Sequence, residues 1–390
     1  MYPTITDFLY DFIGIRILLP IQTFGFFVAL AFIVAAMILQ SELLRKKKLG
    51  ILKSSQEIVI INQRHSFLSI LFSAFLGFFI GFKIVYGLFH YAACADNPQE
   101  FLLSLDGNLS LGIVVAILFI GYKFYENYKI KDKQEEKLEV SIYPHNRVAD
   151  ITFIAAIGGM IGAKLFHFIE YPSQFIDFLH NPISKDFFAG LTMYGGLIVG
   201  AICVIYFAYK KNIPILHLTD CIAPGVMLAY ALGRLGCHFS GDGDWGIVNS
   251  KPNPGLPDWL WSYTYPHNVI KEGVPIPECD PTIYREFCFQ LPEGVWPTSV
   301  YEFIICTFLF LLLIISRHYI KTAGVITCIY FILNGIERFF IELIRVNVKL
   351  EIGNFALTQA QIIAICLISL GLFGLIYLLL ISKKLNNSHE

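Results

Sequence analysis

The feature that most constrains this chain is a series of apolar runs, each about 20 residues long. A helix needs ~20 apolar residues to cross the hydrocarbon core of a bilayer, because each residue advances it by ~1.5 Å. The runs predict nine spans, of which the sixth is interrupted by Asp220 and Pro224. They cover residues 17–39, 67–92, 109–127, 150–170, 190–209, 216–236, 300–316, 323–342 and 360–382. We therefore predict an all-α, polytopic membrane protein.

The composition excludes most other classes of protein. Hydrophobic residues make up 56% of the chain and charged residues only 15%, against roughly a quarter in ordinary globular proteins. The 29 basic and 30 acidic residues nearly cancel, which excludes nucleic-acid binding by bulk charge. Asp7 and Asp11 precede the first apolar run without a basic cluster. We therefore expect that run to remain as a span and not to be removed as a signal peptide.

Basic residues alternate between loops, and this pattern predicts the orientation. Short cytoplasmic loops of membrane proteins are enriched in Lys and Arg. We expect the odd loops and the C-terminal tail in the cytoplasm, the N-terminus outside, and residues 237–299 as an external loop region. The basic residues of the odd loops and tail are Arg45, Lys46, Lys47, Lys48, Lys53, Lys129, Lys131, Lys133, Lys137, Lys210, Lys211, Arg317, Lys321, Lys383 and Lys384.

The nine cysteines form no CxxC pair, so neither a zinc site nor a redox motif is indicated. Cys279 and Cys288 share the predicted external loop. The sequence leaves open whether they form a disulfide there or remain free thiols.

The sequence contains an internal repeat. The segment Gly77–Lys83 resembles Gly158–Lys164, and residues 106–112 parallel residues 194–200. Residues 65–145 are therefore interpreted as a duplicated transmembrane hairpin inserted in a single domain, 1–390, and we expect it to be peripheral to any chemistry. Glycines four residues apart let helices approach closely in lipid, which explains them without a catalytic role.

Charged side chains within spans are costly and by default indicate function. Arg338, Glu342 and Arg345 follow i, i+4, i+7 spacing and would share one helix face. Arg234 stands among small residues, which allow a broken helix end, and backbone N–H groups freed there would favour anions. With the predicted orientation these groups lie in the outer half of the membrane, and a pair of rigid arginines there predicts a receptor for a lipid phosphate.

Two other interpretations of these polar groups compete. Arginines near span ends also extend to the lipid headgroups without any function. The run Gly241–Asp244 suggests calcium, but the full spacing of a calcium loop is missing, so we predict no metal.

Seven blocks of the sequence match one known protein family. They are Thr23–Gly25, Gly158–Phe168, Met193–Leu197, Gly233–Gly236, Trp296–Glu302, Arg338–Arg345 and Thr358–Gln361. Together these blocks resemble the bacterial prolipoprotein diacylglyceryl transferase family. The resemblance covers most of residues 15–380 apart from 65–145, and without that hairpin seven spans remain, which is the family's number, with the family's orientation.

The resemblance implies transfer of a diacylglyceryl group from phosphatidylglycerol to the lipobox cysteine of a prolipoprotein, which releases glycerol phosphate and begins lipoprotein maturation. The implied partners are phosphatidylglycerol, prolipoprotein signal peptides and membrane lipid, and no cofactor is required. The implied location is the bacterial plasma (inner) membrane, with the active site facing the periplasmic side. A membrane transporter and a catalytically altered lipid-binding relative remain as alternatives.

The resemblance also implies the site residues. The expected catalytic residues are Arg234, Arg338, Tyr194 and His238. The expected substrate-binding residues are Arg234, Gly195, Gly196, Gly233, Gly236, Asp242, Gly246, Glu302, Glu342 and Arg345. The chain departs from the family where Tyr194 replaces a histidine, where Cys237 and His238 replace an asparagine, and where Phe24 replaces a tyrosine.

Overall fold

Long helices make up most of the structure. It is a computed structural model, and it describes residues 1–15, 17–19, 21–91, 94, 101, 104–131, 133–180, 192–347, 349–352 and 355–387. Each of the nine predicted spans contains a long helix, although the first helix begins only at Thr23 and residues 20, 92, 190 and 191 lie outside the described residues. The helices are α2 (Thr23–Lys48), α3 (Phe67–Phe79, continued by η1, Ile80–Val85, and α4, Tyr86–Phe89), α7 (Leu109–Lys129), α8 (Val148–Glu170), α10 (Met193–Lys210), α11 (Ile215–Ser240), α14 (Thr298–Ser316), α15 (Val325–Ile341) and α16 (Gln359–Asn387).

Eight of these helical stretches are long and apolar enough to cross a membrane. The ninth, α15, has 17 residues, which corresponds to about 25 Å. Large apolar side chains lie fully open on the outer surface, for example Phe72 at 67% and Phe373 at 72% exposure. An apolar surface of this extent requires lipid as its solvent. The predicted class, a polytopic helical membrane protein, is confirmed.

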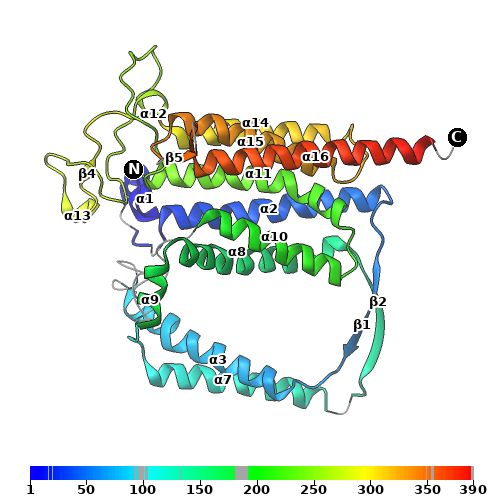
Figure 1. The fold of residues 1–390 in the computed structure, drawn as a ribbon. Coiled ribbons are helices and arrows are strands. Elements are labelled where there is room, and N and C mark those ends of the chain that lie inside the picture. The colour runs from blue at the N-terminus through cyan, green and yellow to red at the C-terminus, as the bar shows by residue number, and fades with distance from the viewer. Residues whose placement is uncertain are drawn as a thin grey trace.

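The helix α11 lies at the centre of the bundle, where it packs against α2, α14 and α15 (Figure 1). Its neighbours α14 and α15 share with it an apolar core that includes Met227, Cys306 and Leu313. The remaining large contacts join α8 to α10 and α15 to α16. The N-terminus lies at one end of the bundle, beside the loop region after α11, and the C-terminus lies at the other.

The predicted break in the sixth span is absent. The helix α11 continues through Pro224 and Arg234 and ends at Gly241, whose φ of 65° stops it. The small residues serve helix packing instead. A Cβ on Gly236 would meet Phe27 of α2 at 2.7 Å, so this glycine lets α2 and α11 approach closely. The expectation of free backbone N–H groups beside Arg234 was therefore wrong.

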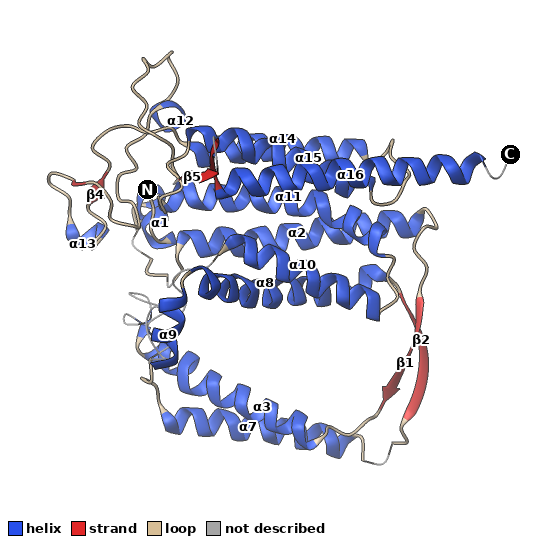
Figure 2. Ribbon diagram, in the orientation of Figure 1, coloured by secondary structure: helices blue, strands red, loops and turns tan. Residues whose placement is uncertain are grey.

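Among the described residues, three two-stranded antiparallel ribbons interrupt the helical fold, and none of them was predicted from the sequence (Figure 2). The largest pairs β1 (Ser55–Ile61) with β2 (Glu136–Ile142) and carries the inserted hairpin at its end. The excursion from the bundle therefore begins about ten residues before the predicted boundary at 65. The others pair β3 (Val274–Pro275) with β4 (Phe289–Gln290), and β5 (Lys349–Ile352) with β6 (Phe355–Thr358).

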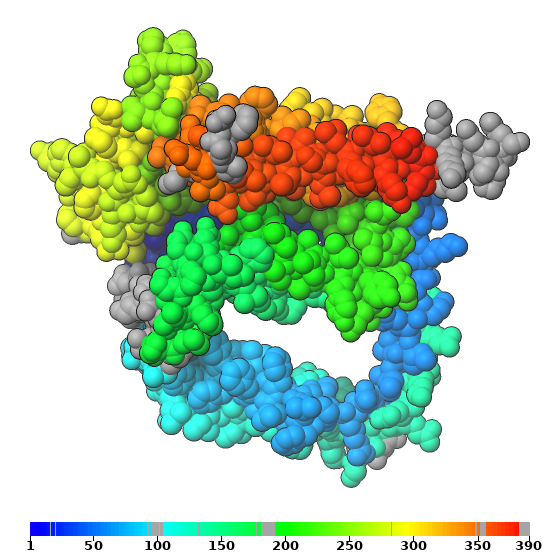
Figure 3. Space-filling model, in the orientation of Figure 1, coloured from blue at the N-terminus to red at the C-terminus, as the bar shows by residue number. Residues whose placement is uncertain are grey.

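The hairpin of α3 and α7 repeats the packing of α8 and α10. A Cβ on Gly81 would meet the Leu111 carbonyl oxygen at 2.3 Å, and one on Gly162 would meet Val199 at 2.4 Å. These pairs occupy equivalent places in the two repeats, so both hairpins close on their glycines as predicted. Figure 3 shows an opening between this hairpin and the bundle, to which β1, β2 and α9 (Pro172–His180) connect it.

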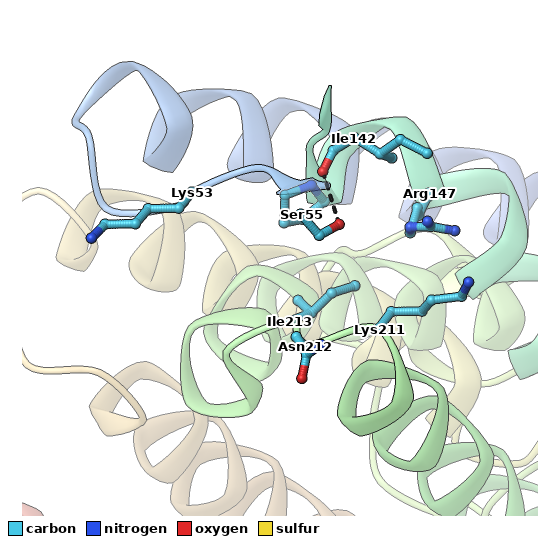
Figure 4. A pocket seen from close by; sticks show the side chains of 8 residues that line it. Lys53, Ser55, Ile142, Arg147, Lys211, Asn212 and Ile213 are labelled. Atoms are coloured by element: carbon cyan, nitrogen blue, oxygen red, sulfur yellow. Dashed lines mark hydrogen bonds between the residues drawn. The ribbon is translucent and has the colours of Figure 1, made fainter. Parts of the chain in front are cut away.

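The ribbon is anchored by ion pairs at the end of the bundle that holds the odd loops. Arg147, in the turn η2 (Pro144–Arg147), pairs with Glu57 of β1, and Lys211 approaches the same carboxylate at 3.2 Å. The hydroxyl of Ser55 donates to the Ile142 carbonyl oxygen beside a small pocket (Figure 4). Burial opposes ionisation of Glu57, but its two cationic partners outweigh this effect and lower its pKa.

The loop region after α11 has its own small core. Trp245, Tyr265, Leu291 and Val295 are buried together, next to the short helix α12 (Asp258–Trp261). A disulfide joins Cys279 and Cys288 beside α13 (Pro281–Tyr284), which resolves the alternative left open by the sequence. The N-terminal helix α1 (Ile5–Ile13) lies against this region, and the amino group of Met1 donates to the Pro266 carbonyl oxygen at 2.7 Å.

Candidate active site

Glu302 is the central residue of an ionic site at the end of the bundle next to the loop region that follows α11. It lies near the start of α14 and is fully buried. One carboxylate oxygen, Oε2, accepts from Tyr230 at 2.9 Å and lies 2.5 Å from Arg234 Nε. The other, Oε1, accepts from Arg338 and Arg345, each at 3.2 Å. Four donors from three segments therefore hold one carboxylate.

Asp244 bridges two of these arginines. Its two carboxylate oxygens pair with Arg234 Nη1 and Arg345 Nη2. Its carbonyl oxygen accepts from the Thr298 hydroxyl at 3.0 Å and from the Ser299 hydroxyl at 2.6 Å, which fixes the loop to the start of α14. Burial alone would raise the pKa of Asp244, but the guanidinium groups outweigh it and lower the pKa to about 2.

Glu342 completes the set from the turn that follows α15. Its Oε2 lies 3.3 Å from Arg338 Nη2 and 3.9 Å from Arg345 Nε, and its Oε1 accepts from Asn347 at 2.5 Å. The helix ends at Ile341, and a 3-10 turn (η4, Glu342–Ile344) redirects the chain so that Arg345 still reaches Glu302. The ion pair expected from the i, i+4 spacing is present. We define the arginine cluster as Arg234, Arg338, Arg345, Asp244, Glu302 and Glu342.

The topology explains why these residues meet. Arg234 is near the end of α11, Glu302 is near the start of α14, and Arg338 is near the end of α15. Because these helices pack side by side with alternating direction, the three positions share one end of the bundle.

The charges in the arginine cluster balance, three cations against three carboxylates. The side chains of Arg234 and Arg345 are only 8% and 7% exposed, whereas that of Asp244 is 30% exposed. Asp244 is therefore the member that an entering anion reaches most directly. A guanidinium group binds two oxygens of a phosphate as readily as two of a carboxylate, so this arrangement can receive a phosphate diester.

The expected glycines contribute mainly to packing. A Cβ on Gly195 would meet Phe166 of α8 at 2.3 Å, and one on Gly196 would meet the Gly159 carbonyl oxygen at 3.0 Å. Gly246 lies equally close to the Ile344 carbonyl oxygen, and Gly236 fits against α2. By contrast, nothing lies within 4 Å of a Cβ on Gly233, one residue before Arg234. Of these five, Gly233 is the one that faces open space.

The two expected proton-transfer residues lie in different surroundings. Tyr194 is half-buried in the first turn of α10 and lies within electrostatic reach of Arg338. Its neighbour Met193 directs a sulfur toward Arg234 at 3.8 Å. His238 instead lies among aromatic rings, with its Nδ1 3.3 Å from the Tyr265 hydroxyl. The contacts described for His238 belong to the core of the loop region after α11 and not to the arginine cluster.

Asp242 lies beside the arginine cluster, where its Oδ1 accepts from the Asp244 backbone N–H at 3.3 Å. Burial and the neighbouring Asp244 carboxylate raise the pKa of Asp242. Cys237, Asp242 and Asp244 offer three ligand atoms within 4.8 Å of one another. Both oxygens of Asp244 already pair with guanidinium groups, however, and these would compete with a metal cation.

Three residues of the site were not predicted as members of it from the sequence. Asp244 was considered only as part of a possible calcium loop, because the sequence does not show that Arg345 folds back onto it. Tyr230 precedes Arg234 by four residues, so both occupy one helix face, and that spacing was an available signal. Asn347, the donor to Glu342, had no sequence signal because it follows the end of the helix.

Comparisons with known proteins show the family to which the chain belongs. The family model described as prolipoprotein diacylglyceryl transferase matches residues 108–377, which includes every member of the arginine cluster. Three similar proteins all carry the name phosphatidylglycerol–prolipoprotein diacylglyceryl transferase. That of Clostridium tetani is 27% identical over 267 residues, 68% of this chain and 88% of its own length. That of Prochlorococcus marinus is 28% identical, with 75% and 97% coverage. That of Streptococcus uberis is 32% identical, with 58% and 76% coverage.

The family match spans well over half of the chain and begins in the loop before α7, the second helix of the inserted hairpin. Six of the seven blocks that resembled the family lie within this match, which also spans the whole ionic site, whereas Thr23–Gly25 precedes it. The chain belongs to the prolipoprotein diacylglyceryl transferase family.

Proposed function

We propose that this protein transfers the diacylglyceryl group of phosphatidylglycerol to the lipobox cysteine thiol of prolipoproteins and releases glycerol phosphate. The observation that carries the proposal is the convergence of Arg234, Arg338 and Arg345 on two shared carboxylates at one end of an apolar bundle. In this reaction a phosphate must leave a glyceryl carbon while sulfur attacks that carbon. Preorganised cations in a site that excludes water stabilise such a leaving group.

The lipid phosphate would take the place of the Asp244 carboxylate. That carboxylate already satisfies Arg234 and Arg345 with one oxygen each, which is the geometry that two phosphate oxygens would reproduce. Rotation of the Asp244 side chain toward solvent would open the position, while Glu302 would keep the guanidinium groups in place from behind. The arginines would then need no rearrangement to receive the substrate.

The thiol must lose its proton, because the thiolate is the nucleophile. Tyr194 is placed to help, since it starts α10 near Arg338 and carries a hydroxyl that can donate or accept a hydrogen bond. Gly233 would leave room for the glyceryl group beside Arg234. With these roles, the site would contact both the thiol of the prolipoprotein and the glyceryl group of the lipid.

The proposed orientation puts the arginine cluster toward the outer leaflet of a bacterial plasma membrane. The loops rich in Lys and Arg lie at the opposite end of the bundle, which favours that end as cytoplasmic. The disulfide between Cys279 and Cys288 lies in the loop region on the side of the arginine cluster, and disulfides persist in oxidising compartments outside the cytoplasm. Lipid and signal peptide would then reach the site laterally from the outer leaflet.

The test uses purified protein in detergent with phosphatidylglycerol and a lipobox peptide. Thioether formation on the peptide and equimolar release of glycerol phosphate are the expected result. The control is Arg317→Lys, an equivalent change at the far end of α14, where Arg317 pairs with Glu42. We expect this variant to keep its activity and Arg234→Lys to lose most of its activity. Lipid binding without glycerol phosphate release from the wild type would refute the proposed transfer.

A further inference from the structure

Glu337 is a buried acidic residue of α15 that the arginine cluster leaves unpaired. It is 6% exposed, and neither of its carboxyl oxygens accepts a hydrogen bond from an N–H or O–H group of the described residues, although the Cys306 thiol of α14, a weak donor, interacts with it. The acidic members of the arginine cluster, by contrast, all pair with guanidinium groups. A carboxyl group without an N–H or O–H donor is costly to bury, so its position requires an explanation.

Glu337 lies where the apolar core of the bundle meets the arginine cluster. Leu333, one turn earlier on the same helix face, packs against the apolar core between α11, α14 and α15. Ile341, one turn later, is also buried. On the opposite flank, Gly335 packs against Ala364 and Ile368 of α16, which carry no charge. Glu337 therefore continues an apolar stripe to the edge of the arginine cluster.

Titratable and charged groups reach Glu337 from the neighbouring elements. Tyr230 and Arg234 come from α11, and Glu302 and Cys306 come from α14. Arg338 follows it directly, and Arg345 approaches from beyond the end of α15. The three arginines are already matched by Asp244, Glu302 and Glu342. An ionised Glu337 would therefore add an unmatched negative charge inside the bundle, which strongly favours the protonated acid.

We propose that Glu337 holds a proton in the resting enzyme and delivers it, during transfer, to the phosphate that leaves the glyceryl carbon; this inference rests on the proposed function. The carbon–sulfur bond forms as the carbon–oxygen bond breaks, and the electron pair of the broken bond stays on the phosphate oxygen. Glu337 gives its proton to that phosphate, and the thiol proton of the incoming cysteine restores the acid. The thiol proton thus ends on glycerol phosphate.

The charge of the site explains why a proton donor is needed. A phosphate diester carries one negative charge, and the monoester that leaves would carry two. The arginine cluster has no unmatched cation to stabilise the second charge. A proton from Glu337 keeps the leaving group at one negative charge, so the total charge of the closed site does not change during the reaction.

The proton itself is measured without substrate, by infrared difference spectroscopy of the purified protein near neutral pH. A protonated carboxylic acid has a carbonyl stretching band distinct from that of a carboxylate. We expect one such band in the wild type, its loss in Glu337→Gln, and its retention in the matched variant Glu342→Gln. A band unchanged in Glu337→Gln, or no band in the wild type, would overturn the assignment.

Kinetics then test whether the proton is used. Glu337→Gln keeps the shape but cannot donate a carboxyl proton, and we expect it to lose at least ~10-fold in turnover with a nearly unchanged KM for phosphatidylglycerol. Glu337→Asp should recover part of the loss. The fall of wild-type turnover with rising pH should vanish in Glu337→Gln. Wild-type turnover and pH profile in folded Glu337→Gln would refute this role and leave the proposed function intact, whereas a wild type that shows the band but no transfer would refute the proposed function.

Discussion

Replacing Arg234 by lysine retains the positive charge but removes the planar fork, so it tests the phosphate receptor directly. The Arg234 guanidinium uses Nε for Glu302 and Nη1 for Asp244 at the same time. An ammonium group is a point charge on a flexible stem and cannot hold both partners in this geometry. When the lipid phosphate takes the place of the Asp244 carboxylate, the lysine variant lacks the oriented N–H donor that Arg234 Nη1 would give to the phosphate.

The magnitude follows from the hydrogen bonds at stake. A hydrogen bond to a charged group contributes about 1.5–3 kcal/mol, and removing one oriented donor from a transition state typically costs about 2.7–4 kcal/mol. A loss of about 3 kcal/mol corresponds to transfer slowed roughly 100-fold. Because Glu302 is fully buried and loses one donor, we also expect a lower melting temperature for Arg234→Lys.

The assay is thioether formation on a lipobox peptide by purified Arg234→Lys and Arg338→Lys, with folding checked by yield and thermal melting in detergent. The control is Arg317→Lys, whose arginine pairs with Glu42 at the other end of the bundle. Transfer at the wild-type rate by both Arg234→Lys and Arg338→Lys would refute the receptor argument, because charge alone would then suffice.

Four further outcomes are expected. Glu342→Gln should lose less transfer activity than Arg338→Lys, because the amide oxygen still accepts one hydrogen bond; a larger loss in the same assay would show that the charge of Glu342 is essential. Lys83→Ala should keep substantial transfer activity in membranes, because Lys83 donates only to carbonyl and hydroxyl oxygens of its own hairpin, including Asp106 O at 2.6 Å; activity as low as that of Arg234→Ala would place the hairpin in the active site. Tyr194→Phe should lose at least ~10-fold, about 1.4 kcal/mol of barrier, and Tyr194→His should retain more activity than the phenylalanine variant, since imidazole also donates and accepts; full activity in Tyr194→Phe would exclude a role for its hydroxyl. Finally, the pKa of Asp244 is lowered to about 2 in the folded protein, so its ion pairs stabilise the fold above the unfolded pKa near 3.8 and this contribution is lost as pH falls toward 2; melting curves of wild type and Asp244→Asn between pH 5 and pH 2 should converge, and parallel curves would contradict the assignment.

The sequence by itself determined the membrane class and the helical spans. Apolar runs of about 20 residues can satisfy their backbone groups in lipid only as helices, so the spans follow from length and composition alone. The repeated glycines also predicted correctly that each hairpin closes on its small residues, because this contact depends on spacing within one helix. Likewise the i, i+4 pairing of Arg338 with Glu342 needed only helix geometry.

Only the tertiary structure decided which polar groups share a site. Asp244 pairs with Arg234, 10 positions before it, and with Arg345, 101 positions after it, and this arrangement depends on a loop that folds back onto the start of α14. The glycines near Arg234 suggested a broken helix, yet α11 stays continuous because Gly236 is used for contact with α2. The ribbon of β1 and β2 carried no signal in the apolar runs, because its strands are short and lie outside the spans. Local spacing therefore specified the membrane helices, and long-range packing specified which charges meet between them.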